Sequence, residues 1–321
     1  MTQVNRELAK KRRFSGTRHL LPLLLCSVMA VFFFLSKQTA SAVLSALELC
    51  LKSVVPSIFP FMVLSRLLVE CGGGELFARL FGRLTQRVFG LSGSAATPIF
   101  LGALCGFPIG AVVCERLYRS GELSLDELEL LIGVVSLPSP AFVINAVGVN
   151  MLGDQRKGLA LYFLLLGVSL AIGLVVCRSS LRKTNDSPAA LRLTPSRKRL
   201  SEVTVDAVSS SATALLSVCA YTAFFSTLSK ALETALSLPE TVSILLKGAL
   251  EFSGGCYAAS GHPYAFSLCA LVLGWSGVGV HFQIMSVCPA EVSYKKFYTI
   301  IFVRALLCFA FSFVILRFFD I

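Results

Sequence analysis

Long apolar segments constrain this chain more than any other feature. A helix needs about 20 apolar residues to cross the hydrocarbon core of a bilayer. The mean hydropathy is +0.77 and only 15% of the residues are charged, which excludes an ordinary soluble enzyme. We therefore expect an all-α integral membrane protein with about seven spanning helices, at approximately 20–36, 42–69, 95–117, 158–177, 205–232, 242–258 and 297–318.

Two further apolar regions are interrupted. Pro138 and Pro140 interrupt 127–152, and Gly274 and Gly277 interrupt 264–290, so each region is either a broken span or a re-entrant pair of half-helices. If both are re-entrant, 19 basic residues fall on the cytoplasmic side and 8 outside, whereas full spans give 16 and 11. Since basic residues collect in the cytoplasm, we expect two re-entrant or broken helical hairpins, with the re-entrant form favoured.

The N-terminus has two interpretations. Basic residues precede the apolar segment 20–36, and Ala40-Ser41-Ala42 follows it, as in a secretory signal peptide with its cleavage site. The alternative is a first transmembrane helix that stays attached, which we favour because many apolar segments follow. In both cases the N-terminus is expected in the cytoplasm and the protein in the cell membrane.

A basic, proline-containing linker at 178–202 divides the chain. We expect residues 1–36 to form a basic N-terminus and first helix, and 37–177 and 203–321 to form two repeats. Gly102-Ala103-Leu104 in the first repeat has a counterpart in Gly248-Ala249-Leu250, and Ser139-Pro140 has one in Ser276-Gly277. The charge assignment makes these repeats inverted, a pattern typical of secondary transporters, although an old duplication kept for packing would look the same.

Catalytic and metal-binding signatures are missing from the sequence. There is no GxSxG, HExxH or Walker A motif and no CxxC pair, and the three histidines are scattered. We expect no enzyme activity, no cofactor and no bound metal. The net charge of +11 is concentrated in 1–18 and 178–202, so it indicates membrane topology rather than nucleic-acid binding.

The expected partners are the lipid bilayer and a small anionic substrate. Half-helix N-termini near mid-membrane present free N–H groups to an anion, and buried polar side chains need partners that a substrate can supply. The alternative is a purely structural role, in which these groups bond to one another or pack helices together. The candidate substrate-binding residues are Gly106, Pro108, Gly110, Ser136, Ser139, Pro140, Asn145, Gly255, Ser276, Gly277, His281, Gln283 and Arg304.

Ionisable residues inside the apolar segments are few and therefore informative. Glu48 and Lys52 are four residues apart on a helix, and we expect a structural ion pair. Arg304 is expected either to meet Glu251 or to hold an anionic substrate. Arg79, Arg83 and Arg87 recur every four positions between apolar residues, which predicts an amphipathic helix on the cytoplasmic lipid face.

Several motifs together resemble a known family. They are Gly106-Phe-Pro-Ile-Gly110-Ala, Arg116-Leu-Tyr-Arg-Ser-Gly-Glu-Leu-Ser, Ser136-Leu-Pro-Ser-Pro-Ala-Phe-Val-Ile, Gly148-Val-Asn-Met-Leu-Gly153 and Gly274-Trp-Ser-Gly-Val-Gly-Val-His-Phe-Gln283. From about Ala42 to Phe318 the chain resembles the YlbJ family of sporulation integral membrane proteins, also called the stage V sporulation protein V family. That family lies within the wider group of nucleoside-recognition, or Gate, membrane domains.

The resemblance implies a polytopic protein that moves dipicolinic acid, a planar aromatic dianion, across a forespore membrane during sporulation, with the outer forespore membrane as the expected location. Partner proteins in that membrane remain unspecified. Two alternatives stay open. One is a nucleoside or ion transporter of the Gate group, and the other is a scaffold that moves no solute and recruits partners through the basic linker.

Overall fold

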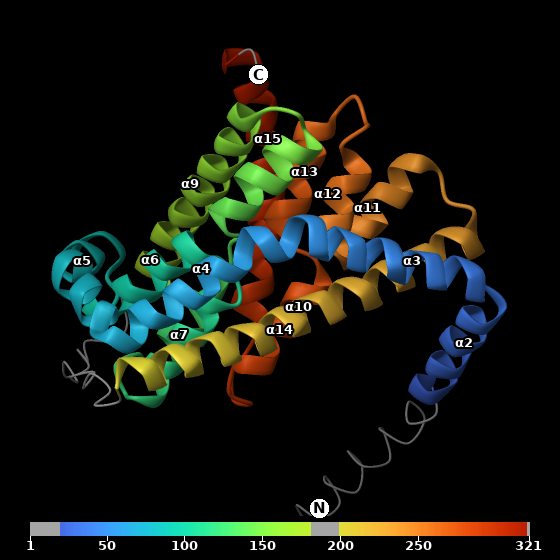
Figure 1. Cartoon of the computed structure of the whole chain (residues 1–321). Coiled ribbons are helices and arrows are strands. Elements are labelled where there is room, and N and C mark those ends of the chain that lie inside the picture. The colour runs from blue at the N-terminus through green and yellow to red at the C-terminus, as the bar shows by residue number, and fades with distance from the viewer. Residues whose placement is uncertain (1–19, 181–198, 320–321) are drawn as a thin grey trace, which may run out of the picture.

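The computed structural model describes residues 20–180 and 199–319 (Figure 1). The basic N-terminus and most of the predicted linker lie outside the described residues. Within them every regular element is helical, which confirms the all-α prediction. The first half contains α2 (Leu20–Phe34), α3 (Ser36–Leu49), η1 (Cys50–Val54), α4 (Val55–Leu68), η2 (Val69–Gly73), α5 (Gly74–Phe89), η3 (Gly93–Ala95), α6 (Ala96–Cys105), α7 (Ile109–Arg119), α8 (Leu125–Val134), η4 (Phe142–Met151) and α9 (Gln155–Ser180). The second contains α10 (Leu200–Leu236), α11 (Glu240–Leu250), α12 (Phe252–Ala259), α13 (Ala265–Trp275), α14 (Val278–Val287) and α15 (Lys295–Phe319).

The described helices include fewer full spans than the sequence suggested. Four are long and apolar enough to cross a bilayer: Gln155–Arg178, Leu200–Leu236, Ala265–Val287 and Lys295–Phe318. The number rises to six if each of two sharply bent pairs counts as one span; α2 and α3 meet at 91°, and α5 and α6 at 107°. The sequence predicted about seven spanning helices, against these four to six candidates, which length and hydropathy alone select among the described residues.

The re-entrant hairpins lie in other segments than expected. α6 packs along α7 and α11 packs along α12, so 95–117 and 242–258 each fold back on themselves. The helices of these hairpins have 8 to 11 residues. At 1.5 Å per residue they extend about 12–17 Å, roughly half the hydrocarbon thickness. These segments were expected to span, and the structure corrects that.

The two interrupted regions are broken spans. α13 and α14 continue as one 23-residue apolar segment, and 72% of its most apolar window is buried inside the protein. Burial explains how the break is tolerated, since protein rather than lipid surrounds the interrupted backbone. α8 begins near Lys296, which contacts Asp126 at 2.8 Å, and η4 ends at the opposite side of the molecule beside Lys37. The preference for re-entrant hairpins at 127–152 and 264–290 was therefore wrong.

The two halves share one order of elements: a long helical segment, a hairpin, a broken helix and a second long helix. The segment formed by α3, η1 and α4 lies alongside α10 and runs antiparallel to it (Figure 1). Lys37 lines a cavity with Lys230, and Met62, further along, lines another with Ala214. Counterpart helices that run in opposite directions are the arrangement expected of inverted repeats.

α5 forms where the arginine periodicity predicted an amphipathic helix. Its Phe77 is buried and stacks near Phe100, with ring centroids 4.1 Å apart, while Leu76, Leu80 and Leu84 are exposed along one side. Exposed leucines beside a row of arginines suit a helix at a membrane surface.

Candidate functional site

Each hairpin tip packs against the break of the broken helix that follows it. In the first half, a Cβ atom at Gly106 would lie 2.4 Å from the backbone N of Ser139. In the second half, a Cβ atom at Gly277 would lie 2.9 Å from the backbone N of Phe252. Both glycines also have a φ near +75°, at +72° and +78°, which side chains disfavour. Glycine is therefore needed at both contacts, since a side chain would separate tip from break.

Aromatic rings join the two tips at the centre of the molecule. Phe107 of the first tip meets Phe252 of the second edge to face, with ring centroids 5.1 Å apart. Phe142, the first residue of η4, meets Phe252 in the same manner at 5.0 Å. These rings close the space between the hairpins.

Arg304 of α15 joins three other helices near the second break. Its Nε–H donates to the carbonyl oxygen of Gly274 at 2.9 Å, and Nη1 donates to the carbonyl oxygen of Gly133 and to Ser169 Oγ, both at 3.2 Å. Nη2 donates to Ser276 Oγ at 3.1 Å. The side chain is fully buried. Its acceptors lie at or near the C-terminal ends of α8 and α13, where a positive charge is favourable.

Arg304 does not meet Glu251, which was one of its two expected roles, and its contact with an anionic substrate stays a prediction. No carboxylate of the described residues forms an ion pair with it, and Glu251 has other partners. Arg304 lines neither cavity described below. It is placed to hold the broken helices together.

His281 and Gln283 of α14 are buried with unsatisfied acceptors. His281 Nε2 lies 2.9 Å from the carbonyl oxygen of Trp275, so this nitrogen carries the proton that it donates. His281 Nδ1 and Gln283 Oε1 have no hydrogen-bond partner among the described residues. The His281 ring contacts the rings of Trp275, Phe297 and Tyr298 edge on. Both residues lie away from the two cavities.

The other polar residues predicted near the first break have local partners. Ser136 Oγ donates to the carbonyl oxygen of Ile132, and Ser139 Oγ accepts from the backbone N of Phe142 at 3.2 Å, which caps η4. Pro140 follows that cap. Asn145 is exposed and lines neither cavity.

Two predicted glycines bring helices together. A Cβ atom at Gly110 would lie 2.8 Å from the side chain of Val135, and one at Gly255 would lie 2.3 Å from the Cα of Gly248. The second contact brings α12 against α11 within the hairpin. Both positions fit the packing alternative.

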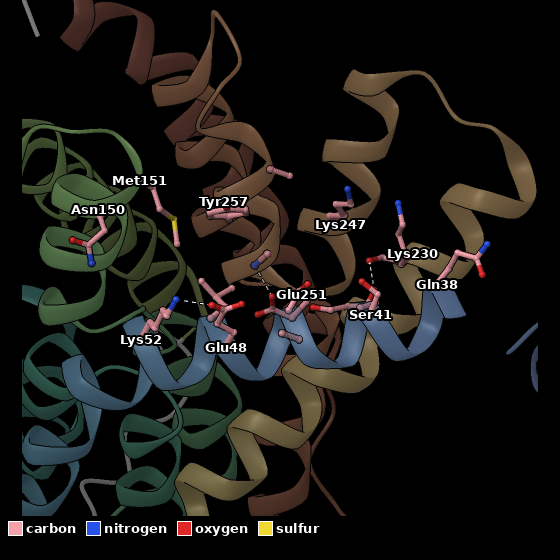
Figure 2. A pocket seen from close by; sticks show the side chains of 18 of the residues that line it. Gln38, Ser41, Glu48, Lys52, Asn150, Met151, Lys230, Lys247, Glu251 and Tyr257 are labelled. Carbon is pink, nitrogen blue, oxygen red and sulfur yellow. Dashed lines mark hydrogen bonds and ion pairs between the residues drawn. The ribbon is translucent and has the colours of Figure 1, made fainter. Parts of the chain in front are cut away.

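A cavity of about 770 Å³ opens between α3, α10 and the second hairpin (Figure 2). Figure 2 shows Ser41 and Glu48 of α3 and Lys52 of η1 along one side of it. None of the thirteen predicted binding residues lines this cavity. Its lining is Lys37, Gln38, Ser41, Ala42, Ser45, Ala46, Glu48, Leu49, Lys52, Asn150, Met151, Ser226, Ser229, Lys230, Lys247, Glu251, Gly254, Tyr257 and Ala258.

Basic residues exceed acidic ones in this lining, with four lysines against two glutamates. Lys52 pairs with Glu48 at 2.5 Å, which confirms the predicted ion pair. Lys230 and Lys247 share Glu233, at 3.2 and 3.3 Å. The remaining positive charge makes the cavity attractive to an anion.

Glu251 lies at the tip of the second hairpin and lines the same cavity. Its Oε1 accepts from the backbone N of Ser253 at 3.0 Å, and its Oε2 accepts from the backbone N of Gly254 at 2.6 Å. The Ser253 hydroxyl contacts both oxygens, at 2.7 and 2.8 Å. Only 4% of the residue is exposed. An internal carboxylate thus occupies the N-terminus of α12.

A second, smaller cavity of about 110 Å³ lies at the other hairpin. Pro108 and Ile109 of the first tip line it, together with Met62 of α4 and Ala214 of α10. Arg66 and Arg116 also line it, and Arg116 pairs with Glu70 at 2.9 Å. Each hairpin tip therefore has a cavity of its own.

A spacing signal identifies the cavity residues that the sequence reasoning missed. Polar residues of α3 and η1 recur every three or four positions, at Gln38, Ser41, Ser45, Glu48 and Lys52. This spacing places them on one helix face, and that face lines the cavity. A polar stripe on an otherwise apolar helix indicates a water-filled space beside it.

Fold and site together define a class: an all-helical integral membrane protein of two related halves, with a re-entrant hairpin in each. Residues 51–155 match the model of the Gate family, which is described as nucleoside recognition. The match runs from η1 to the start of α9 and includes the first hairpin and the first broken helix.

The chain is also similar to the sporulation integral membrane protein YlbJ of Bacillus subtilis (strain 168), at 27% identity over 214 residues. The aligned region covers 61% of this chain and 52% of the relative, so the chain spans about half the length of the curated relative it matches. No solved structure gives a significant match. The two matches confirm the family resemblance inferred from the motifs.

Proposed function

We propose that this protein moves a small anion across a membrane by exposing one central region alternately to the two sides. The observation that carries the proposal is the pair of cavities, because they lie at equivalent hairpins and at opposite ends of the molecule. One has about 770 Å³ and the other about 110 Å³. Inverted halves can exchange conformations, and such an exchange would close the large cavity and open the small one.

The charge of the large cavity supports an anionic substrate. Its lysines exceed its glutamates, and serine hydroxyls and the amides of Gln38 and Asn150 add neutral hydrogen-bond donors. Dipicolinate, a planar aromatic dianion, is the substrate we propose. The similar protein of Bacillus subtilis is named as a sporulation integral membrane protein, which supports a sporulation membrane as the location. We place the protein in the outer forespore membrane and regard it as a transporter rather than an enzyme.

The positions of the hairpins also support an orientation. With hairpins at α6–α7 and α11–α12 and with two broken spans, 21 basic residues fall on the side of the N-terminus and 6 on the other. This bias exceeds the 19 to 8 of the arrangement expected from sequence. It favours a cytoplasmic N-terminus, with the large cavity on the opposite side.

Counterflow in proteoliposomes tests the proposal. Vesicles preloaded with unlabelled dipicolinate should take up labelled dipicolinate with saturation. The double change Lys230→Gln and Lys247→Gln should raise the dipicolinate concentration at half-saturation at least about tenfold. Each lost charge contact to an anion is worth roughly 1.5–3 kcal/mol. Arg156→Gln is the matched control, because Arg156 is exposed, has the same charge and does not line the cavity.

Each possible result of this assay is decisive. Saturable counterflow that both lysine changes weaken supports the assignment. Saturable counterflow of labelled uridine but not of labelled dipicolinate would replace the anion with a nucleoside. Absence of saturable exchange for both compounds in correctly inserted protein would refute transport and favour the scaffold alternative.

A further inference from the structure

Glu251 is a buried carboxylate at the point where the second hairpin reverses. Its backbone is extended, with φ −144° and ψ 120°, and it separates α11 from α12 without a proline or a glycine at the break itself. Its carboxylate lines the large cavity and caps α12. The group therefore contacts both the aqueous space and the element that must move if the cavity is to close.

The hydrogen-bond donors to this carboxylate among the described residues are all neutral. They are the backbone N–H groups of Ser253 and Gly254 and the Ser253 hydroxyl, and the side chain of Thr222 of α10 also stabilises it. Lys247, one turn earlier on α11, contacts Glu233 instead. In the part of the chain that the structure describes, no lysine or arginine forms an ion pair with Glu251.

The other ionisable groups around Glu251 come from three elements. Cys50 of η1 and Cys256 of α12 are close enough to interact with its charge. Glu48 of α3 and Lys52 of η1 share the cavity but pair with each other. None of these groups supplies a fixed positive charge to Glu251. A carboxylate without such a charge can exist in protonated and ionised forms of comparable free energy once water reaches it.

Protonation has a mechanical consequence at this position. The ionised carboxylate accepts charge-assisted hydrogen bonds from the first turn of α12, and these are about twice as strong as neutral ones. A proton on Glu251 weakens this cap, and the tip that it holds packs against the break at Gly277. The protonation state of one residue is thus linked to the contact between hairpin and broken helix.

We propose that Glu251 is the proton-exchanging group of this protein: it binds a proton from the large cavity, and the proton crosses the membrane with the anion. The inference rests on the transport function proposed above and adds its coupling. In each cycle the carboxylate gains one proton from water on the side of the large cavity. It releases that proton to water on the other side, so a proton gradient drives accumulation of the anion.

The experiment follows protons and dipicolinate in the same proteoliposomes, with the membrane potential clamped by valinomycin and potassium. Dipicolinate added outside should acidify a trapped pH-sensitive dye. For one proton per cycle, steady-state accumulation should rise about tenfold for each unit by which the outside is more acidic. Glu251→Gln should abolish both effects while labelled dipicolinate still exchanges in counterflow.

Glu240→Gln is the matched control, since Glu240 has the same charge, is exposed on α11 and does not line the cavity, and it should retain proton movement. Proton movement in Glu251→Gln equal to that of the unaltered protein overturns the inference and leaves transport intact. Counterflow without any proton movement in the unaltered protein overturns it too. Absence of counterflow in the unaltered protein overturns the proposed function and, with it, the coupling.

Glu251→Gln can be well inserted and monodisperse and yet exchange nothing. In that case Glu251→Asp decides, because it restores an ionisable group on a shorter side chain. Exchange by Glu251→Asp that still carries protons supports the inference, whereas exchange that carries none overturns it.

Discussion

Arg304 keeps its charge in the protein interior without a carboxylate partner. Its four hydrogen bonds end on the carbonyl oxygens of Gly274 and Gly133 and on two hydroxyls. Unsatisfied carbonyl groups at the ends of α8 and α13 carry partial negative charge, so two broken helices jointly act as the counter-ion. A break in a helix leaves carbonyl groups without donors, and the Arg304 guanidinium supplies donors to the ends of both α8 and α13.

Replacing Arg304 should therefore destabilise the fold. We expect Arg304→Met to lower the unfolding free energy by at least about 3 kcal/mol, since several buried acceptors lose their donor at about 1–3 kcal/mol each. Arg304→Lys should recover only part of this, because an ammonium cannot reach all four acceptors. Thermal unfolding in detergent measures the effect. Arg317→Met on the same helix is exposed and should change little; equal shifts at both positions would contradict this role.

Sequence reasoning identified Arg304 as unusual but not its partners. Its acceptors are backbone atoms 171 and 30 residues away in the chain and hydroxyls on α9 and beside α13. Carbonyl groups carry no sequence signal, so a search for acidic partners could find only Glu251. The ion pair of Glu48 and Lys52 was predictable for the opposite reason, because both residues lie on one helix at i and i+4.

At the scale of elements, the hairpins depend on close contact between short helices. In the second hairpin, Gly255 of α12 lies against Gly248 of α11, and a Cβ atom at 255 would lie 2.3 Å from the Cα of Gly248. The nearest atoms on α11 are backbone atoms of Gly248, so no flexible side chain could move aside to make room for a Cβ atom at position 255. The spacing of the two helices is thus fixed by the absence of side chains.

We expect Gly255→Ala to force α11 and α12 apart and to cost about 1–3 kcal/mol, the usual range for overpacking. It should also reduce counterflow, because the hairpin borders the large cavity. The control is Gly261→Ala between α12 and α13, where an added Cβ atom would meet nothing within 4 Å. Unfolding temperature and counterflow are the measurements, and unchanged values for Gly255→Ala would refute the packing role.

Hydropathy could not show which elements fold back. A 23-residue apolar segment and two antiparallel helices of 10 or 11 residues contain the same number of apolar residues. At Gly106 the chain reverses through a backbone with φ +72°, whereas the second hairpin breaks at Glu251 without a residue of special conformation. The prolines at 138 and 140 were the most visible breaks, but Ser139 caps η4 there and the chain continues onward.

At the scale of the whole molecule, the inverted arrangement predicts which loops share a side. With Cys26 and Cys71 replaced by serine because they are exposed, Asn185→Cys should react with an impermeant maleimide only from the cytoplasm. Gly261→Cys, in the exposed loop between α12 and α13, should react only from the opposite side. Burial raises the pKa of Cys288 to about 11, so this thiol stays protonated near neutral pH and should add little background.

Reaction of both introduced cysteines from one side would contradict the inverted arrangement. Reaction from the two expected sides with the orientation reversed would keep the arrangement and overturn the cytoplasmic N-terminus. The division into two halves was visible in the sequence because glycine and serine motifs recur in order. Their antiparallel packing was not, since it depends on contacts between α3, α4 and α10.

The meeting of Phe107 with Phe252 has a consequence for the ancestry of the fold. Phe107 lies three residues after Leu104, and Phe252 lies two residues after its counterpart Leu250, so the contact joins near-equivalent positions of the two hairpin tips. In an ancestor of half the length, the same contact would form between two identical chains, but only if they were inserted in opposite orientations. Fusion of the two copies would make orientation heritable, and we expect the basic residues at 178–199 to hold each half in the direction that the contact demands.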